Sequence, residues 1–226
     1  MIELRDVTHD FDGVPVLRGL SLRLAERRIA IIGDNGSGKS TLARMLNGLL
    51  VPRAGDVLVN DVSTRADPAA ARAAVGLVFQ NPEHQIVMPT VEEDLAFGPR
   101  NLNLPQAEIT ARVDDLLARY GLRDKRQRPA HLLSGGEKKL LSVLSVVIMA
   151  PRTIVFDEPM TSLDRRNRAR MAGVIADLPQ QVITITHDLD LIAGYDRAIL
   201  MSAGEIADDG APAEVIARYT AQDENA

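Results

Sequence analysis

Residues 29–40, which read IAIIGDNGSGKS, decide the fold of this chain. The apolar run 29–32 is typical of a buried strand, and residues 41–46, TLARML, continue with the spacing of a helix. Between strand and helix, residues 33–40 match the pattern G-x-x-x-x-G-K-[ST] in full. A glycine-rich loop that joins a strand to a helix in this way predicts a site for nucleotide phosphates.

Each residue type in this loop has a chemical reason to be there. Glycines let backbone N–H groups converge on a phosphate, and the following helix presents its positive N-terminal end. Lys39 can reach the terminal phosphates, and the Ser40 hydroxyl can ligate Mg²⁺. A flexible turn would explain the glycines but not Lys39 and Ser40 in this register. We expect these residues to bind the nucleotide: Gly33, Asp34, Asn35, Gly36, Ser37, Gly38, Lys39, Ser40 and Thr41.

The composition excludes several classes of protein. The 226 residues suffice for one α/β domain with a sizeable insertion. The 26 Lys and Arg against 31 Asp and Glu leave a net charge of −5, so we predict no nucleic-acid partner. With no cysteine there is no disulfide scaffold or thiolate metal site. We expect no secretion signal, and the most continuous apolar stretch, 140–150, is too short to cross a bilayer, so a membrane role must run through a partner.

Apolar periodicity predicts two kinds of strand. Residues 2–7 and 20–24 alternate apolar and polar, which is typical of strands with one exposed face and predicts an antiparallel edge layer. Other short runs are mostly apolar and rich in β-branched residues, as expected for a parallel sheet buried on both faces. These runs are residues 29–32, 75–79, 153–156 and 182–186.

Residues 81–150 carry helical patterns instead. The clearest is 105–120, where apolar residues recur with the helical period until Gly121 ends the segment. We expect a helical subdomain at 81–150, inserted into a catalytic α/β core formed by residues 1–80 and 151–226. The polar tail, 221–226, is expected to fray.

A second chemistry-bearing motif is TIVFDEP, residues 153–159, a buried strand that ends in two acids. Asp157 can hold the Mg²⁺ shell, and Glu158 can polarise an attacking water. Because strand side chains alternate, the two carboxylates need not compete for one ligand position. Taken alone the pair could be a solvated strand end, but the phosphate loop upstream favours the catalytic interpretation.

A third motif, LSGGE at residues 133–137, precedes a helical run. Ser134 is a natural N-cap, and Gly135 and Gly136 permit close backbone approach, so this helix start can also grip an anion. In isolation such a motif is most often a cap and a turn. Here it resembles the signature loop of ABC-type ATPases.

The resemblance extends over the whole chain. Gln80 ends a strand where that family has its Q-loop, residues 161–164, TSLD, occupy the D-loop position, and His187 closes a strand as the switch histidine does. Read without this alignment, His187 would more often be a structural or surface histidine. The motif order is complete, and it implies a RecA-like P-loop NTPase core.

The resemblance also implies a head-to-tail dimer, of two copies or with a related ATPase, in which the phosphate loop of one subunit and the signature loop of the other enclose each ATP. It implies that Glu158 is the catalytic base, that His187 stabilises the transition state and that Gln80 senses the γ-phosphate or metal. The implied Mg²⁺ ligands are Ser40, Gln80 and Asp157. The implied contacts to the neighbouring subunit's ATP are Ser134, Gly135, Gly136 and Glu137, with Asp164 in the D-loop.

Phe11, Glu137 and Leu140 differ from the residues that are most common in the family at these positions. Phe11 lies where the family usually has an aromatic residue, often Tyr, that stacks on adenine, although a core residue of an edge strand is an equal alternative. Glu137 replaces the common Gln, and Leu140 stands where an Arg often follows. A carboxylate near a triphosphate would repel it unless the side chain points away.

Residues 77–101, LVFQNPEHQIVMPTVEEDLAFGPRN, resemble the ATPases of energy-coupling-factor importers, which take up vitamins, nickel and cobalt. In that family the segment after the Q-loop meets the coupling helices of a transmembrane subunit, and Ile86, Val87 and Met88 suit such a contact. An ordinary loop that covers the sheet is the alternative. The chain is short for that group, which favours a homodimeric unit, with biotin as the expected substrate.

The resemblance places the protein peripherally on the cytoplasmic face of the cell membrane, with a transmembrane coupling subunit and a substrate-binding membrane subunit as partners. Two alternatives stay open. A conventional ABC importer or exporter ATPase would share every catalytic motif and differ mainly in residues 80–101. A soluble ABC ATPase, such as one that acts in iron–sulfur assembly, is the other.

Overall fold

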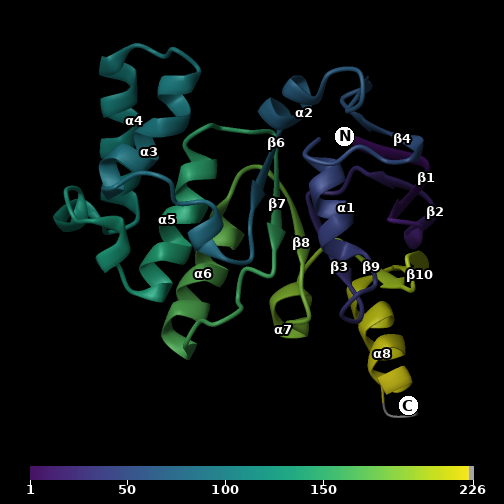
Figure 1. Ribbon diagram of the computed structural model, residues 1–226. Coiled ribbons are helices and arrows are strands. Elements are labelled where there is room, and N and C mark those ends of the chain that lie inside the picture. Colours follow the sequence, from purple (N-terminus) through teal and green to yellow (C-terminus); the bar gives the residue numbers. More distant parts are fainter. Residues whose placement is uncertain (224–226) are drawn as a thin grey trace.

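The structure, a computed structural model, describes residues 1–223 as two sheets with helices packed around them (Figure 1). The last helix, α8 (Pro212–Asp223), contains the start of the tail that was expected to fray, and the remainder of that tail lies outside the described residues. No helix in residues 1–223 is both long enough and apolar enough to span a membrane.

The larger sheet forms the centre of the molecule. Its six strands, in spatial order, are β10 (Glu205–Gly210), β9 (Arg197–Ser202), β3 (Arg28–Ile32), β8 (Gln181–Ile185), β7 (Thr153–Asp157) and β6 (Val75–Val78). The strands from β9 to β6 pair in parallel, and β10 adds an antiparallel edge. Every residue of β7 is buried, as expected for a strand covered on both faces. The predicted parallel sheet is confirmed.

The sequence analysis did not identify β9 and β10. They form a hairpin through Ala203 and Gly204, which both have positive φ, at 48° and 83°. Such a turn is normally signalled by Asn-Gly or Asp-Gly, and alanine at a left-handed position gives no such signal. In β10 the residues are mostly acidic or small, so the alternation of apolar and polar residues is weak as well.

The smaller sheet is the predicted antiparallel layer. Its order is β2 (Val14–Leu24), β1 (Ile2–Phe11), β4 (Ala54–Val59) and β5 (Val62–Ser63). The first helix, α1 (Lys39–Leu46), lies between this layer and the central sheet, so Leu42 and Met45 share one buried cluster with Leu4 and Val155. The hydrophobic packing of α1 on both sides fixes the loop that precedes it.

Helices account for the chain between β6 and β7 (Figure 1). These are η1 (Pro82–His84), α3 (Val91–Asn101), α4 (Gln106–Arg119), η2 (Arg123–Lys125), η3 (Ala130–Leu132) and α5 (Gly135–Val147). The helical period read in residues 105–120 is confirmed, because Ile109, Val113, Leu116 and Leu117 are the buried residues of α4. The remaining helices are α2 (Pro68–Ala74), α6 (Arg165–Asp177) and α7 (Leu189–Ile192). The exact division into core and subdomain stays a prediction.

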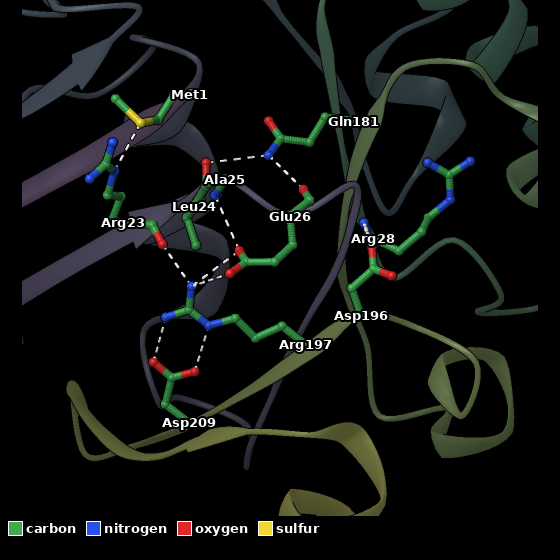
Figure 2. A network of polar contacts seen from close by, with 10 residues as sticks. All are labelled: Met1, Arg23, Leu24, Ala25, Glu26, Arg28, Gln181, Asp196, Arg197 and Asp209. Carbon is green, nitrogen blue, oxygen red and sulfur yellow. Dashed lines mark hydrogen bonds and ion pairs between the residues drawn. The ribbon is translucent and has the colours of Figure 1, made fainter.

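Polar side chains join the two sheets at the amino ends of the parallel strands, as Figure 2 shows. Arg197, which begins β9, donates to both oxygens of Asp209, at 2.6 and 2.5 Å, and to Glu26. The Gln181 amide donates to the carbonyls of Leu24 and Glu26. The Asp209 contact raises the pKa of Arg197. This network holds the end of β2 against the starts of β8 and β9.

Candidate active site

A cavity of about 780 Å³ opens at the carboxyl ends of β3, β7 and β8. Its volume lies within the range of roughly 300–1,000 Å³ that small-molecule sites occupy. The expected site residues in its lining are Phe11, Gly33, Asp34, Asn35, Gly36, Gly38, Lys39, Ser40, Thr41, Gln80, Asp157, Glu158 and His187. Parallel strands place their carboxyl ends together, which explains why motifs far apart in the chain meet here.

The phosphate loop is shaped by its glycines. Gly38, the residue before α1, has φ 98°, a left-handed conformation that side chains disfavour. At Gly33 an added Cβ would lie 2.0 Å from the carbonyl oxygen of Met201, so no larger residue fits. The loop therefore approaches β9 closely and delivers the N-terminus of α1 to the cavity, where backbone N–H groups can receive an anion.

Lys39 folds back over this loop. Its Nζ donates to the carbonyls of Gly33 and Asp34, both at 2.7 Å, and to Ser37 Oγ at 3.3 Å. Ser37 is thus buried beneath the cavity and supports the lysine without lining the cavity itself. Burial lowers the pKa of Lys39, and nearby carboxylates, Glu158 first, raise it. An ammonium held only by neutral oxygens is well suited to exchange them for charged phosphate oxygens.

Ser40 and Asp157, two of the three expected Mg²⁺ ligands, lie within hydrogen-bond distance of each other in the cavity. Ser40 Oγ donates to Asp157 Oδ1 at 3.1 Å. Burial raises the pKa of Asp157, and the Ser40 hydrogen bond opposes that rise. A hydroxyl and a carboxylate so close together fit Mg²⁺, a hard cation that takes oxygen ligands and commonly completes its shell with phosphates and water. Gln80, which was expected to end the strand, lies two residues beyond the end of β6 and lines the same cavity.

Glu158 stands just beyond β7 in a strained conformation. Its φ is 51°, in the left-handed region, and its N–H donates to the carbonyl of Ile185 at 2.9 Å. The carboxylate lies 2.9 Å from His187 Nδ1, and the Thr186 hydroxyl is 3.5 Å away. Because the Glu158 side chain is only 13% exposed whereas His187 is 69% exposed, the histidine stands at the solvent side of the pair. Such strain also occurs in turns, as at Ala203, but here it coincides with a carboxylate that lines the cavity, which favours a functional role for Glu158.

Phe11 forms the opposite wall of the cavity. It ends β1, is 46% exposed and packs edge-on against His9 at 4.8 Å between ring centroids. A core residue would be buried, so the exposure of Phe11 argues against the alternative that it is a core residue of an edge strand. An exposed ring face on a nucleotide cavity is suited to stacking on a base.

The signature loop lies outside this cavity. Ser134 caps α5 in a reciprocal capping box with Glu137, which satisfies two backbone N–H groups. An added Cβ at Gly136 would lie 2.4 Å from the Asn167 side chain, which is itself bound to Asp164 at the start of α6. The signature loop and the D-loop are therefore neighbours within one chain; Thr161 of the D-loop lines the phosphate-loop cavity, whereas residues 133–137 do not.

The Glu137 carboxylate is engaged by its own subunit. It pairs with Lys125 and accepts from the backbone N–H of Ser134. The Lys125 hydrogen bond lowers the pKa of Glu137 to about 2, although burial opposes the shift. Because Lys125 compensates the charge of this carboxylate, Glu137 repels an anion less than an unpaired carboxylate would. Leu140, at the other unusual position, is a buried core residue.

We expect Glu137→Gln to lower the free energy of unfolding by about 1–2 kcal/mol at pH 7, since Gln preserves the capping box but not the ion pair. Because the folded pKa is depressed from 4.5 to about 2, the stabilisation is present above pH 4.5 and is lost as pH falls toward 2. Urea unfolding of both proteins at several pH values measures the difference. A difference that stays constant down to pH 3 would contradict the assignment.

The sequence analysis missed other residues of the cavity, above all Tyr219. This residue of α8 lines the cavity, and its hydroxyl donates to Asp34 Oδ1 at 3.1 Å. The contact joins residues 185 positions apart, so no local pattern signals it. Val16, which no sequence pattern singled out, also lines the cavity, as do Thr161 of the D-loop and Ile185 of the predicted strand 182–186, neither of which was expected to bind nucleotide.

Several known proteins are similar in sequence to this chain over nearly its full length. A putative ABC transporter ATP-binding protein of Deinococcus radiodurans is 57% identical over 97% of each chain. The biotin transport ATP-binding protein BioM of Rhodobacter capsulatus is 44% identical over 97% of this chain and 94% of its own. The energy-coupling factor transporter ATP-binding protein EcfA of Methanothermobacter thermautotrophicus is 39% identical over 95% of this chain and 72% of its own.

A solved structure agrees with these relatives. That of cbiO1 from Clostridium perfringens, part of the ABC transporter complex cbiONQ, has a TM-score of 0.85 at 31% identity and covers 99% of this chain and 94% of its own. The resemblance to energy-coupling-factor ATPases is thus confirmed. Residues 17–161 match the sequence profile of the family described as ABC transporter. The chain therefore belongs to the ABC transporter family, as an ATP-binding subunit that couples ATP hydrolysis to transport.

Proposed function

We propose that this protein powers the uptake of a vitamin, with biotin as the preferred candidate, through an energy-coupling-factor importer in the cell membrane. Nickel or cobalt is the second substrate class. The observation that supports this proposal most strongly is the match to BioM of Rhodobacter capsulatus, a biotin transport ATP-binding protein, over nearly all of both chains. The CbiO1 match supports the wider group.

In this proposal each residue at the cavity has a defined task. Lys39 releases its loop carbonyls and binds the terminal phosphates of ATP, while Ser40, Asp157 and Gln80 would hold Mg²⁺, which would supply charge neutralisation at those phosphates. Glu158 accepts a proton from the attacking water, and His187, 2.9 Å from it, orients the carboxylate before ATP arrives. Phe11 stacks on the adenine.

The signature loop requires a second ATPase subunit. Ser134 and Gly135 are exposed at the start of α5, a helix N-terminus suited to an anion, yet they lie outside the cavity of their own subunit. A head-to-tail partner, another copy or a relative, brings the same loop to each cavity and encloses ATP between the subunits. Opening and closing of this dimer then moves the membrane partner.

An apolar loop after η1 is the proposed contact with that partner. Val87 is 59% exposed, and it lines a groove of about 290 Å³ together with Ile86, Met88 and His131. Buried Asp94 fixes the loop, because its Oδ1 accepts from the N–H groups of Val87 at 2.9 Å and Met88 at 3.1 Å. A preformed groove whose lining is mostly apolar, with Glu83 and His131 as its polar members, suits a helix of a transmembrane coupling subunit at the cytoplasmic membrane face.

The test is purification of the tagged chain from detergent-solubilised native membranes, followed by mass spectrometry. We expect a helical membrane scaffold and a small membrane protein whose bound ligand identifies the substrate. Val87→Glu places a charge in the groove and should reduce recovery of both by about tenfold or more. Val62→Glu, which changes another exposed valine on β5 in the antiparallel layer, is the matched control and should have no effect.

Recovery of only soluble partners would overturn the transport role and favour a soluble assembly ATPase. Recovery of a conventional transporter membrane domain, without a separate small ligand-binding membrane protein, would favour the importer or exporter alternative.

A further inference from the structure

Lys139 is a buried charged residue to which the proposed mechanism gives no task. It lies in α5, two residues after Glu137 of the signature loop, and is only 2% exposed. Its Nζ donates to the carbonyl oxygens of Gln80 at 2.6 Å, Phe79 at 3.2 Å and Glu158 at 3.3 Å. An ammonium group has three N–H donors, and here each can meet a backbone carbonyl.

This placement is costly, so packing alone does not account for it. Within residues 1–223 the ion pairs do not include Lys139, and burial lowers its pKa to about 8, while Asp157 and Glu158 act in the opposite direction. An apolar side chain would fill the space without desolvating a charge. What the ammonium adds is a set of directional bonds to two chain segments that are far apart in sequence.

Both segments carry residues that act on ATP. Gln80 lines the nucleotide cavity and also a second groove of about 360 Å³, whose lining includes Lys139, Gly135 and the D-loop residue Thr161. The carbonyl of Glu158 belongs to the residue with the strained φ of 51°. That carbonyl receives Lys139 Nζ and, at 3.4 Å, the N–H of Thr161. Lys139 thus holds the backbone that aims the Glu158 carboxylate.

We propose that Lys139 is a positioning residue for ATP hydrolysis, one that ties the signature end of α5 to Gln80 and to the backbone of Glu158 in the same subunit. The inference rests on the proposed function, because the signature loop acts on the partner's ATP. When that loop engages the partner's nucleotide, the shift of α5 is carried by Lys139 to the hydrolytic groups of its own subunit. Each subunit therefore adjusts its base to the occupancy of its neighbour.

The contact predicts an effect on turnover that is separate from ATP binding. The hydrogen bonds of Lys139 do not involve Lys39 or the phosphate loop, so nucleotide affinity should survive its loss. The Glu158 carboxylate would instead be less precisely aimed at the water. Small errors in the placement of a base reduce turnover sharply.

The experiment compares three variants of the full chain, each assayed for steady-state ATP hydrolysis, nucleotide affinity and thermal unfolding. Lys139→Met removes all donors and should lower kcat by about tenfold or more, with KM for ATP within about threefold of wild type. Lys139→Gln keeps two donors on a shorter chain and should give an intermediate kcat. Lys138→Met, which removes the neighbouring lysine and its 2.5 Å pair with Glu83, should leave kcat unchanged.

The readout separates positioning from simple stabilisation. If Lys139→Met folds, binds nucleotide and hydrolyses ATP with the wild-type kcat per binding site, the inference is overturned, even if the Tm of the variant is lower. If that variant does not fold, Lys139→Gln decides in the same way. Failure of the proposed dimer is recognised independently: a Glu158→Gln protein that stays monomeric with ATP refutes the shared site, whatever the Lys139 variants do.

Discussion

Glu158→Gln is expected to lower the rate of ATP hydrolysis by about 100-fold or more while ATP stays bound. The amide is nearly the same size as the carboxylate, and it can still hydrogen-bond to His187, but it cannot accept the proton of an attacking water. General-base catalysis typically contributes about 10²–10⁴-fold, which sets the expected loss. With hydrolysis blocked, the ATP that joins two subunits persists, so size-exclusion chromatography should show an ATP-dependent dimer.

The control for this variant is Glu108→Gln, the same chemical change on the surface of α4, where Glu108 pairs with Arg112. It should hydrolyse ATP at the wild-type rate and form no lasting dimer. Single-turnover assays distinguish a slow chemical step from slow product release. Normal turnover by Glu158→Gln would mean that another group activates the water, and the assignment of the base would be wrong.

Lys39→Ala has the second large expected effect, a loss of nucleotide binding or of hydrolysis. A charge-assisted hydrogen bond contributes about 1.5–3 kcal/mol, so losing it should raise the Kd for ATP by about 10- to 100-fold. Wild-type Lys39 donates to loop carbonyls of Gly33 and Asp34, so the variant also leaves the empty loop less ordered. Isothermal titration with ATP and with ADP measures the loss at the terminal phosphates.

Lys138→Ala is the matched comparison, because it makes the same chemical change at a lysine that lies outside the cavity. We expect its ATP affinity to equal that of the wild type. Full ATP binding and hydrolysis in Lys39→Ala would refute the phosphate-site interpretation of residues 33–40.

The residues of this site that are identifiable from sequence are those whose chemistry is local. A phosphate loop needs its glycines, lysine and serine in one register, and a carboxylate at a strand end follows directly from the strand, so Lys39, Ser40 and Asp157 could be predicted from the sequence alone. The central strands were identifiable for a similar reason, because burial on both faces demands continuous apolar runs.

Lys139 and Tyr219 show where this approach fails. In sequence, Lys139 is the second of two adjacent lysines, a pattern typical of an exposed helix face, and only the fold reveals the carbonyls around it. Tyr219 gives no local sign of its contact with Asp34. Both depend on tertiary contacts between distant segments, which periodicity does not encode.

The Arg197 network has a consequence for how the protein tolerates change. It joins the two sheets at the amino ends of the parallel strands (Figure 2), whereas the cavity lies at their carboxyl ends. The residues at the cavity can therefore include energetically unfavourable features, such as the desolvated Lys39 ammonium and the positive φ of Glu158, without weakening the contacts that join the sheets. Substitutions that alter catalysis or partner choice can accumulate at the cavity, while loss of Arg197 would weaken the polar contacts between the sheets at the opposite ends of the strands and leave their shared apolar core in place.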